Sequence, residues 1–299
     1  CFVGILLFAS AGLFFALGPP TGAPPFEFSL DQSVPCPAGS QDYILADTGG
    51  GAPLLPNEDE AVAKVLDGIP SHLKKMLRDL RSPSAGITVV HQGKVLLSRF
   101  EGTAKVGGTV APFGDTGYLI ASITKTFTTA MMYKLRDEGK LPPLGIDAPL
   151  TALFPKFRMK SKFGVQGITL RNIAMHASGL PREGPPCQGC STPPTTDEWL
   201  SRIAEHEVLS APWQSTHYSN LGLVLLGRAL EVVANKSWER YVAEDILEPL
   251  GMVGSGNPPW RNATLRGQMA DGVDPDTQKV HQLPNATDWG APCGSMFST

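Results

Sequence analysis

The sequence predicts an α+β fold, because a short hairpin pattern is followed by a long block of helical patterns. Ile87–Val90 and Val95–Phe100 are apolar runs on either side of the turn residues His91–Gly93, as expected for two antiparallel strands. After Ser122 the helical patterns recur without the strand–helix alternation that is typical of a parallel sheet. With 299 residues, 42% of them hydrophobic, the chain is long enough to bury a sizeable core.

One helix is predicted before the hairpin, over residues 58–80. Proline lacks a backbone N–H, so this helix is expected to break near Pro70. Its apolar residues have the spacing of one helix face: Val65, Leu73, Met76, Leu77 and Leu80.

The most regular helical pattern runs from Ser122 to Glu138. A short strand is predicted before it, at Tyr118–Ala121. The helix is expected to stop at Gly139, because glycine suits the left-handed turn after a helix. The residues expected to bury this helix are Ile123, Phe127, Ala130, Met131 and Leu135. Further helices are predicted over 168–176, 196–209, 219–234 and 237–248, and mostly loops over 252–299.

The N-terminal part has a different composition. Residues 1–18 are apolar except for Ser10, and as a helix they would span about 27 Å, close to the hydrocarbon thickness of a bilayer. They are predicted to be a transmembrane signal anchor or a signal peptide. Residues 19–57 are rich in Pro and Gly and read as a linker, so residues 58–299 would form the folded domain.

The predicted location is a single-pass membrane protein with its domain in the lumen or outside the cell, or alternatively a secreted protein. No Lys or Arg occurs between residue 18 and Lys64, which indicates that this side faces away from the cytoplasm. Sequons at Asn235, Asn262 and Asn285 are consistent with glycosylation in that setting.

Four cysteines beyond Cys1 favour disulfides of unassigned connectivity: Cys36, Cys187, Cys190 and Cys293. A zinc site at Cys187–Cys190 would need a second cysteine pair or a histidine pair, so no metal is expected. The net charge of -3, without any basic run, gives no reason to expect a nucleic-acid partner.

Ser122-Ile-Thr-Lys125 is the main candidate for chemistry. Residues three apart lie on one helix face, so the amine of Lys125 can reach the hydroxyl of Ser122. A lysine in water is a poor base, but burial is expected to lower its pKa towards about 7–8. Ser71-His-Leu-Lys74 has the same spacing and lies in a charged amphipathic segment, where the lysine is expected to be solvated.

Tyr218-Ser-Asn220 is a second candidate, at the start of an apolar helix. The phenol of Tyr218 can relay a proton to a leaving group, and the amide of Asn220 can bind a substrate carbonyl and the lysine amine. The alternative for this segment is a helix N-cap beside a packed tyrosine. His217 is expected to be an exposed neighbour, and Trp199, Trp213 and Trp238 are expected to pack in the core or the cleft.

Together these segments resemble the class C β-lactamase and D,D-peptidase family. Ser122-Ile-Thr-Lys125 and Tyr218-Ser-Asn220 are similar to its first two motifs. Three other segments also resemble the family: Leu135–Leu141, Ile168–Pro181 and Cys293–Thr299. The likeness covers about residues 60–299 and implies a β-lactamase/transpeptidase-like fold, with an antiparallel sheet flanked by helices and a helical subdomain. In that family the histidine equivalent to His176 lies in a structural loop, so no catalytic role is assigned to it.

The resemblance implies a serine hydrolase that forms an acyl-enzyme on Ser122, with Lys125 as base, Tyr218 as proton relay and Asn220 as substrate-binding residue. It implies no cofactor, and a small-molecule, peptide or ester substrate. The family's third motif, Lys or His followed by Ser/Thr and Gly, does not follow Asn220. The chain is therefore expected to be truncated at its C-terminus, inactive as given and not stably folded. A catalytically silent binding or scaffold protein is the alternative function.

Overall fold

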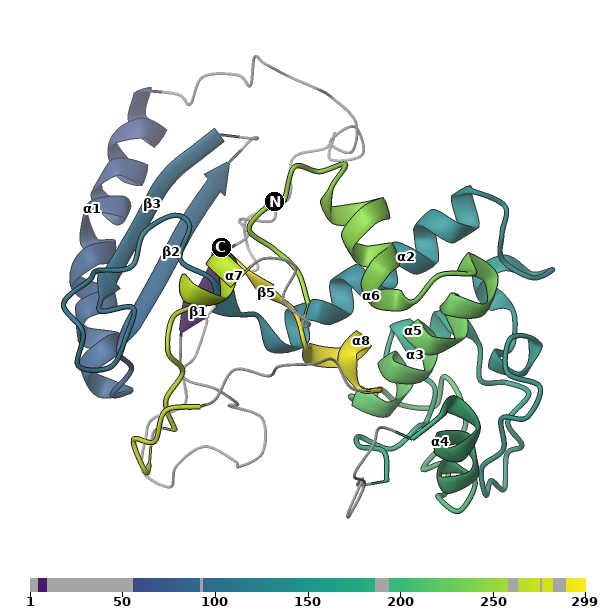
Figure 1. The fold of residues 1–299 in the computed structure, drawn as a ribbon. Helices are drawn as coiled ribbons and strands as arrows, with labels where there is room; N and C mark the ends of the chain where they lie inside the picture. The colour runs from purple at the N-terminus through teal and green to yellow at the C-terminus, as the bar shows by residue number, and fades with distance from the viewer. Residues whose placement is uncertain are drawn as a thin grey trace. The chain divides into compact units, whose positions relative to one another are not determined.

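The computed structural model describes residues 5–9, 56–91, 94–185, 194–257, 263–274, 276–281 and 289–299 (Figure 1). The chain forms two compact units. The first contains residues 1–118 and 268–282, and the second contains residues 119–267 and 283–299.

The sheet of the first unit is antiparallel and has the strand order β1-β2-β3. Its strands are β1 (Ile5–Ala9), β2 (Ser84–His91) and β3 (Lys94–Gly102). The predicted hairpin is β2 and β3, each longer than the sequence pattern suggested, with Ile87 opposite Arg99 and a bulge between Val89 and Val90.

Helix α1 (Pro56–Asp79) lies along the hairpin and covers one of its faces (Figure 1). The predicted break at Pro70 is wrong, because α1 continues through this residue. Apolar side chains on both sides of Pro70 pack against Ile87 and Val89, namely Leu66, Ile69, Leu73, Met76 and Leu77. This burial offsets the loss of about 3 kcal/mol that an internal proline causes. Val65, which was expected on the buried face, is 69% exposed.

The second unit is mainly helical around one buried core. The division between the units falls within β4 (Tyr118–Leu119). The elements of the second unit after β4 are η1 (Ala121–Ile123), α2 (Thr124–Asp137), η2 (Gly145–Asp147), η3 (Leu150–Ala152), α3 (Leu170–Ala174), α4 (Thr196–Ile203), α5 (Asn220–Ala234), α6 (Trp238–Tyr241), the π-helix η4 (Val242–Leu247), α7 (Ala263–Gly267), α8 (Ala291–Gly294) and β5 (Phe297–Ser298). Helix α5 packs against α2 and α8, and α8 also packs against α2.

Helix α5 is buried nearly all round over Leu221–Leu230, as its continuous apolar sequence requires. It begins after Ser219, whose hydroxyl accepts the backbone N–H of Gly222, and it ends at Asn235 in the left-handed conformation. The predicted helix 219–234 is therefore confirmed.

Three other predicted helices differ from the structure. The first α-helical residue of the central helix is Thr124 rather than Ser122, because a 3₁₀ turn precedes it. Helix α4 ends at Ile203, since the backbone N–H of Val208 donates to the carbonyl of Lys160 outside any helix. The segment predicted as a helix over 237–248 is a short α-helix that continues as a π-helix.

The buried face of α2 agrees with the predicted one at Met131 and Leu135 but not at Ala130. Thr124, Lys125 and Thr128 are buried with Met131, Met132 and Leu135, whereas Ala130 is exposed. The threonine hydroxyls explain the shift, because they form hydrogen bonds inside the unit: Thr128 donates to the carbonyl of Pro292, and Thr124 accepts the backbone N–H of Met296.

The predicted membrane segment falls largely outside the described residues. Of residues 1–18 the structure describes only Ile5–Ala9, which form a strand rather than part of a helix. In the described part of the chain, helices of a length and hydropathy suited to crossing a bilayer are absent. The linker predicted over 19–57 lies outside the described residues as far as residue 55, and α1 begins at Pro56.

Candidate active site

Ser122 lies in the 3₁₀ turn that precedes α2. Ala121, the residue before it, has φ +43°, a left-handed conformation that costs an L-residue about 1–2 kcal/mol. The turn is held from outside, because the N–H of Ile120 donates to the carbonyl of Met296 at 2.9 Å. The nucleophile candidate is thus fixed by backbone contacts in a strained turn.

Lys125 is 7% exposed and faces Ser122 across the first turn of α2. Its Nζ lies 2.9 Å from Ser122 Oγ and 2.6 Å from the backbone carbonyl oxygen of Cys293. The predicted burial of this lysine is confirmed. The carbonyl is an acceptor only, so it directs one N–H of the amine away from Ser122.

Tyr218 is the second group in contact with Ser122. Its hydroxyl donates to Ser122 Oγ at 2.5 Å, and Lys125 Nζ lies 4.9 Å from the centre of its ring. Arg182 stacks over the same ring at 5.1 Å, so two cations face the aromatic π-system. The structure therefore brings Ser122, Lys125 and Tyr218 together, although 96 residues separate Ser122 from Tyr218.

Asn220 does not make the predicted contact with the lysine. Within the described residues its Nδ2 donates to Glu183 Oε1 at 2.7 Å rather than contacting Lys125. The reason is local: Asn220 is the first residue of α5, and its backbone N–H donates to the carbonyl of Arg182 at 2.7 Å, which brings the next residue, Glu183, beside the amide.

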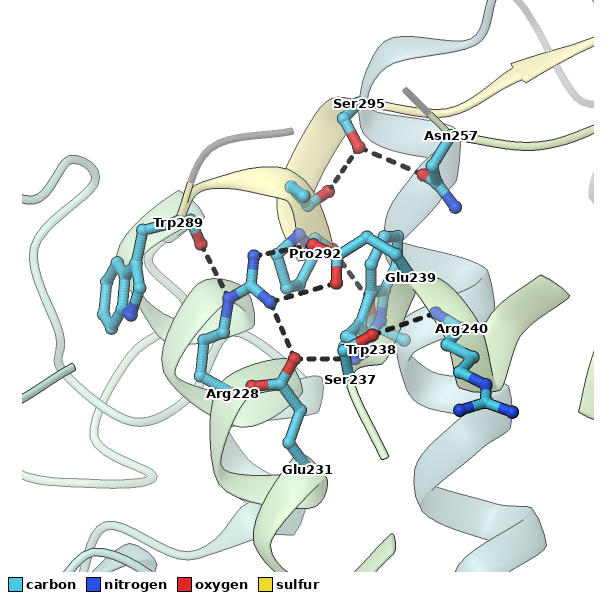
Figure 2. Close-up of polar contacts among 12 residues, drawn as sticks. Arg228, Glu231, Ser237, Trp238, Glu239, Arg240, Asn257, Trp289, Pro292 and Ser295 are labelled. Carbon is cyan, nitrogen blue, oxygen red and sulfur yellow. Dashed lines mark hydrogen bonds and ion pairs between the residues drawn. The ribbon is translucent and has the colours of Figure 1, made fainter. Parts of the chain in front are cut away.

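The carbonyl of Cys293 belongs to α8, and a buried ionic cluster holds the segment that carries it (Figure 2). Arg228 of α5, 9% exposed at its side chain, donates through Nε to the carbonyl of Trp289 at 3.1 Å. Its remaining nitrogens bind Glu231 at 2.7 Å and Glu239 at 2.9 Å. One arginine therefore connects α5, α6 and the segment leading into α8.

Burial raises the pKa of Glu231 above its ordinary value, although Arg228 and the N–H of Trp238 act in the opposite direction. This cluster was not predicted from the sequence. The signal was present, because Arg228 is the one charged residue in the apolar run Leu221–Leu230, and a charge inside a buried helix requires partners.

His176 was also missed as a neighbour of the site. Its ring stacks on that of Tyr218, with the centroids 4.5 Å apart, and its Nδ1 accepts the backbone N–H of Ser219 at 3.0 Å. His217 is exposed and pairs with Ser215 at 2.7 Å, as expected of a solvent-facing neighbour.

The other predicted residues lie elsewhere. The second S-x-x-K copy falls on α1, where the side chain of Lys74 is 60% exposed, which confirms that it is solvated. Asn235 is exposed, whereas Asn262 and Asn285 lie outside the described residues. Cys36, Cys187 and Cys190 are also outside them, so the predicted disulfides stay predictions. Of the predicted packed tryptophans, Trp238 is fully buried but Trp213 is 53% exposed. Among the described residues there is no group of three His, Cys, Asp or Glu that could hold a metal ion.

Comparisons with known proteins agree on one family. The Beta-lactamase family model matches residues 69–299. Beta-lactamase-like protein 2 of Dictyostelium discoideum is 32% identical over 254 residues, which are 81% of this chain and 44% of that protein. The D-alanyl-D-alanine-carboxypeptidase/endopeptidase AmpH of Escherichia coli is 33% identical over 168 residues, 55% of this chain and 43% of that protein. The chain thus spans less than half the length of these curated relatives.

Solved structures with a similar fold belong to related enzymes. The crystal structure of the Beta-lactamase/D-alanine Carboxypeptidase from Yersinia pestis complexed with citrate has a TM-score of 0.61 and 27% identity, over 75% of this chain and 61% of that one. The β-lactamase/transpeptidase-like fold expected from the resemblance is confirmed. The chain belongs to the beta-lactamase family, a family of serine hydrolases.

Proposed function

We propose that this chain carries the catalytic residues of a serine hydrolase that cleaves an amide or ester bond through an acyl-enzyme. One observation carries the proposal: Ser122 Oγ lies within hydrogen-bond distance of both Lys125 Nζ and Tyr218 Oη. A nucleophile, a base and a second proton-transfer group in mutual contact are the parts that acyl transfer requires.

In the first step Lys125, as a neutral amine, accepts the proton of Ser122. One N–H points to the carbonyl of Cys293, so the nitrogen lone pair is left for the hydroxyl. Ser122 Oγ then bonds to the substrate carbonyl carbon. The bond to the leaving nitrogen or oxygen breaks, and Tyr218 passes a proton to that atom, which Lys125 replaces. Water attacks the resulting ester, releases the acid and restores the hydroxyl of Ser122.

Two groups would position the substrate. The backbone N–H of Ser122 would supply one donor to the oxyanion. The amide of Asn220 would bind the substrate carbonyl after exchanging its bond to the exposed carboxylate of Glu183. The names of the E. coli and Yersinia pestis relatives favour a peptide substrate, and small esters share the same chemistry.

Labelling with a fluorescent fluorophosphonate and a fluorescent penicillin tests the proposal in the full-length protein. Wild type should be labelled, and Ser122→Ala and Lys125→Met should not. Ser71→Ala is the matched control, because it removes the serine of the other S-x-x-K copy, and it should be labelled as wild type is. If Ser122→Ala is labelled as wild type is, the proposed nucleophile is wrong. If wild type stays unlabelled, the silent scaffold is favoured.

We also propose that the domain lies in a lumenal or extracellular compartment, on a membrane anchor or secreted. Asn235 supports this, because it is an exposed turn residue at the end of α5 within an Asn-x-Ser sequon. Protein from eukaryotic cells should lose mass on treatment with a peptide N-glycosidase, and Asn235→Gln should lose less. An unglycosylated Asn235 would remove this support.

A further inference from the structure

His176 contacts three consecutive residues of the segment that carries the phenol. Its carbonyl accepts the backbone N–H of His217 at 2.8 Å, its ring stacks on Tyr218, and its Nδ1 accepts the backbone N–H of Ser219 at 3.0 Å. The loop presents the ring through a left-handed backbone, with φ +58° at His176. Only a few per cent of non-glycine residues have such a φ.

We propose that His176 is a positioning residue for Tyr218 and that it performs this role only with Nδ1 unprotonated. The inference rests on the proposed function, since it concerns the proton relay of that site. An imidazole nitrogen that accepts an N–H must offer its lone pair, so the ring is the neutral tautomer with its proton on Nε2. A protonated ring has a donor on both nitrogens, and Nδ1–H would then face the N–H of Ser219.

The surrounding charges favour the neutral ring. Lys125 of α2 lies 4.9 Å from the ring centre of Tyr218, on which His176 stacks, and Arg182 of the loop after α3 lies 5.1 Å from it. Burial lowers the pKa of His176, and Lys125 lowers it further whenever its amine carries the proton taken from Ser122. The carboxylate near this group, Glu183, is 61% exposed at its side chain and binds Asn220 and Arg182 rather than the imidazole.

Loss of the contact to Ser219 would act on the reaction through Tyr218. The Ser219 N–H is adjacent in the chain to Tyr218, whose hydroxyl is 2.5 Å from Ser122 Oγ. A proton-transfer group works only within hydrogen-bond reach, and a displacement of about 1 Å can lower a rate by about a hundredfold. Protonation of His176 should therefore slow acylation without a change in the nucleophile.

Two substitutions separate the acceptor from the ring. His176→Asn places an amide oxygen where Nδ1 lies, cannot titrate and tolerates the left-handed backbone. His176→Phe keeps a ring to stack on Tyr218 but has no acceptor. His72→Asn is the matched control, because His72 is an exposed histidine on α1 whose Nδ1 pairs with a backbone carbonyl.

The test is the acylation rate constant of the full-length protein with a fluorescent penicillin between pH 5 and 9, because the lactam nitrogen of this probe needs the proton that Tyr218 passes on. The rate constant of wild type is divided by that of each variant at the same pH. The ratio of wild type to His176→Asn should be constant at high pH and fall by up to about tenfold per pH unit below the pKa of His176, because only wild type has an ionisable side chain at this position. His176→Phe should react at least about tenfold more slowly than His176→Asn at pH 8. The ratio of wild type to His72→Asn should be flat.

A constant ratio of wild type to His176→Asn over the whole range would overturn the proposal, whether or not His176→Phe folds. Equal rates for His176→Phe and His176→Asn, in proteins with the same circular dichroism, would overturn it as well. Labelling of Ser122→Ala at the wild-type rate would instead disprove the proposed function, so the two failures are distinguishable.

Discussion

Removal of the Arg228 guanidinium tests how much the buried ionic cluster contributes to the stability of the second unit. Arg228→Met keeps most of the aliphatic stem and deletes the guanidinium. Three acceptors then lose the partner seen in Figure 2: the carboxylates of Glu231 and Glu239 and the carbonyl of Trp289. The two glutamate side chains are only 22% and 17% exposed. Breaking a buried ion pair on one side typically costs about 3–5 kcal/mol, so we expect a loss of this size in the free energy of unfolding.

The matched control is Arg240→Met. Arg240 also pairs with a glutamate, Glu244, at 2.7 Å, but its side chain is 68% exposed. Exposed ion pairs contribute about 0–1 kcal/mol, so this change should be nearly neutral. The difference between the two variants compares a buried arginine with three acceptors against an exposed arginine with one ion pair.

Urea unfolding of the full-length protein, followed by fluorescence and by circular dichroism, measures both changes. Arg228→Met should lower the midpoint with the slope unchanged. Adding Glu239→Gln to Arg228→Met should restore part of the loss, because it removes one of the unpaired charges. If Arg228→Met loses less than about 1 kcal/mol, or no more than Arg240→Met, the cluster does not hold the helices as the distances imply.

Three further predictions concern stability. Gly179→Ala should lower the free energy of unfolding by about 3 kcal/mol or more, because φ is +75° and the new Cβ would lie 2.0 Å from a backbone carbonyl oxygen. Its control, Gly164→Ala, has φ +70° but open space around the new Cβ, so it should lower this free energy by about 1–2 kcal/mol. Equal losses of the two variants in urea unfolding would contradict this prediction. Gly227→Ala should lower the free energy of unfolding by about 1–3 kcal/mol, although alanine has the better helix propensity, because its Cβ would lie 2.4 Å from the ring of Pro292. An unchanged melting temperature would show that α5 and α8 can move apart to accept the methyl group. The pKa of His176 is lower in the folded protein than the ordinary 6.5. As the pH drops below about 6.5 the unfolded chain therefore binds a proton at His176 before the folded protein does, and the free energy of unfolding should fall. In urea unfolding between pH 5 and 8, His176→Asn should show a smaller fall than wild type.

The local part of the site was predictable from the sequence because it follows from helix geometry. Ser122 and Lys125 lie three residues apart, so a helical backbone places their side chains on the same face, within reach of each other. The apolar pattern of α5 likewise predicted a buried helix whose first residues would be held in place. The hairpin β2–β3 was also predictable from local sequence, because the pairing of two neighbouring apolar runs depends on the turn that joins them.

The errors arose where packing outweighed a local rule. Pro70 lacks an N–H, yet α1 continues, because apolar residues before and after it pack on the same sheet face. The buried face of α2 was predicted only in part, for a related reason. Thr124 and Thr128 are polar in composition but are buried, since their partners come from a segment more than 160 residues further along the chain.

Long-range contacts also decide which groups the site contains. The contact of Lys125 with the carbonyl of Cys293 spans 168 residues and involves a backbone atom, so the identity of residue 293 carries no signal for it. The opposite holds for Arg228, whose charge in an apolar helix demands acceptors and therefore predicts a buried cluster without naming its members. Asn220 shows a further limit: its type suits a substrate carbonyl, but the structure pairs it with Glu183. Residue type thus predicts which bonds a side chain can form, and only the fold decides which of them it forms before substrate arrives.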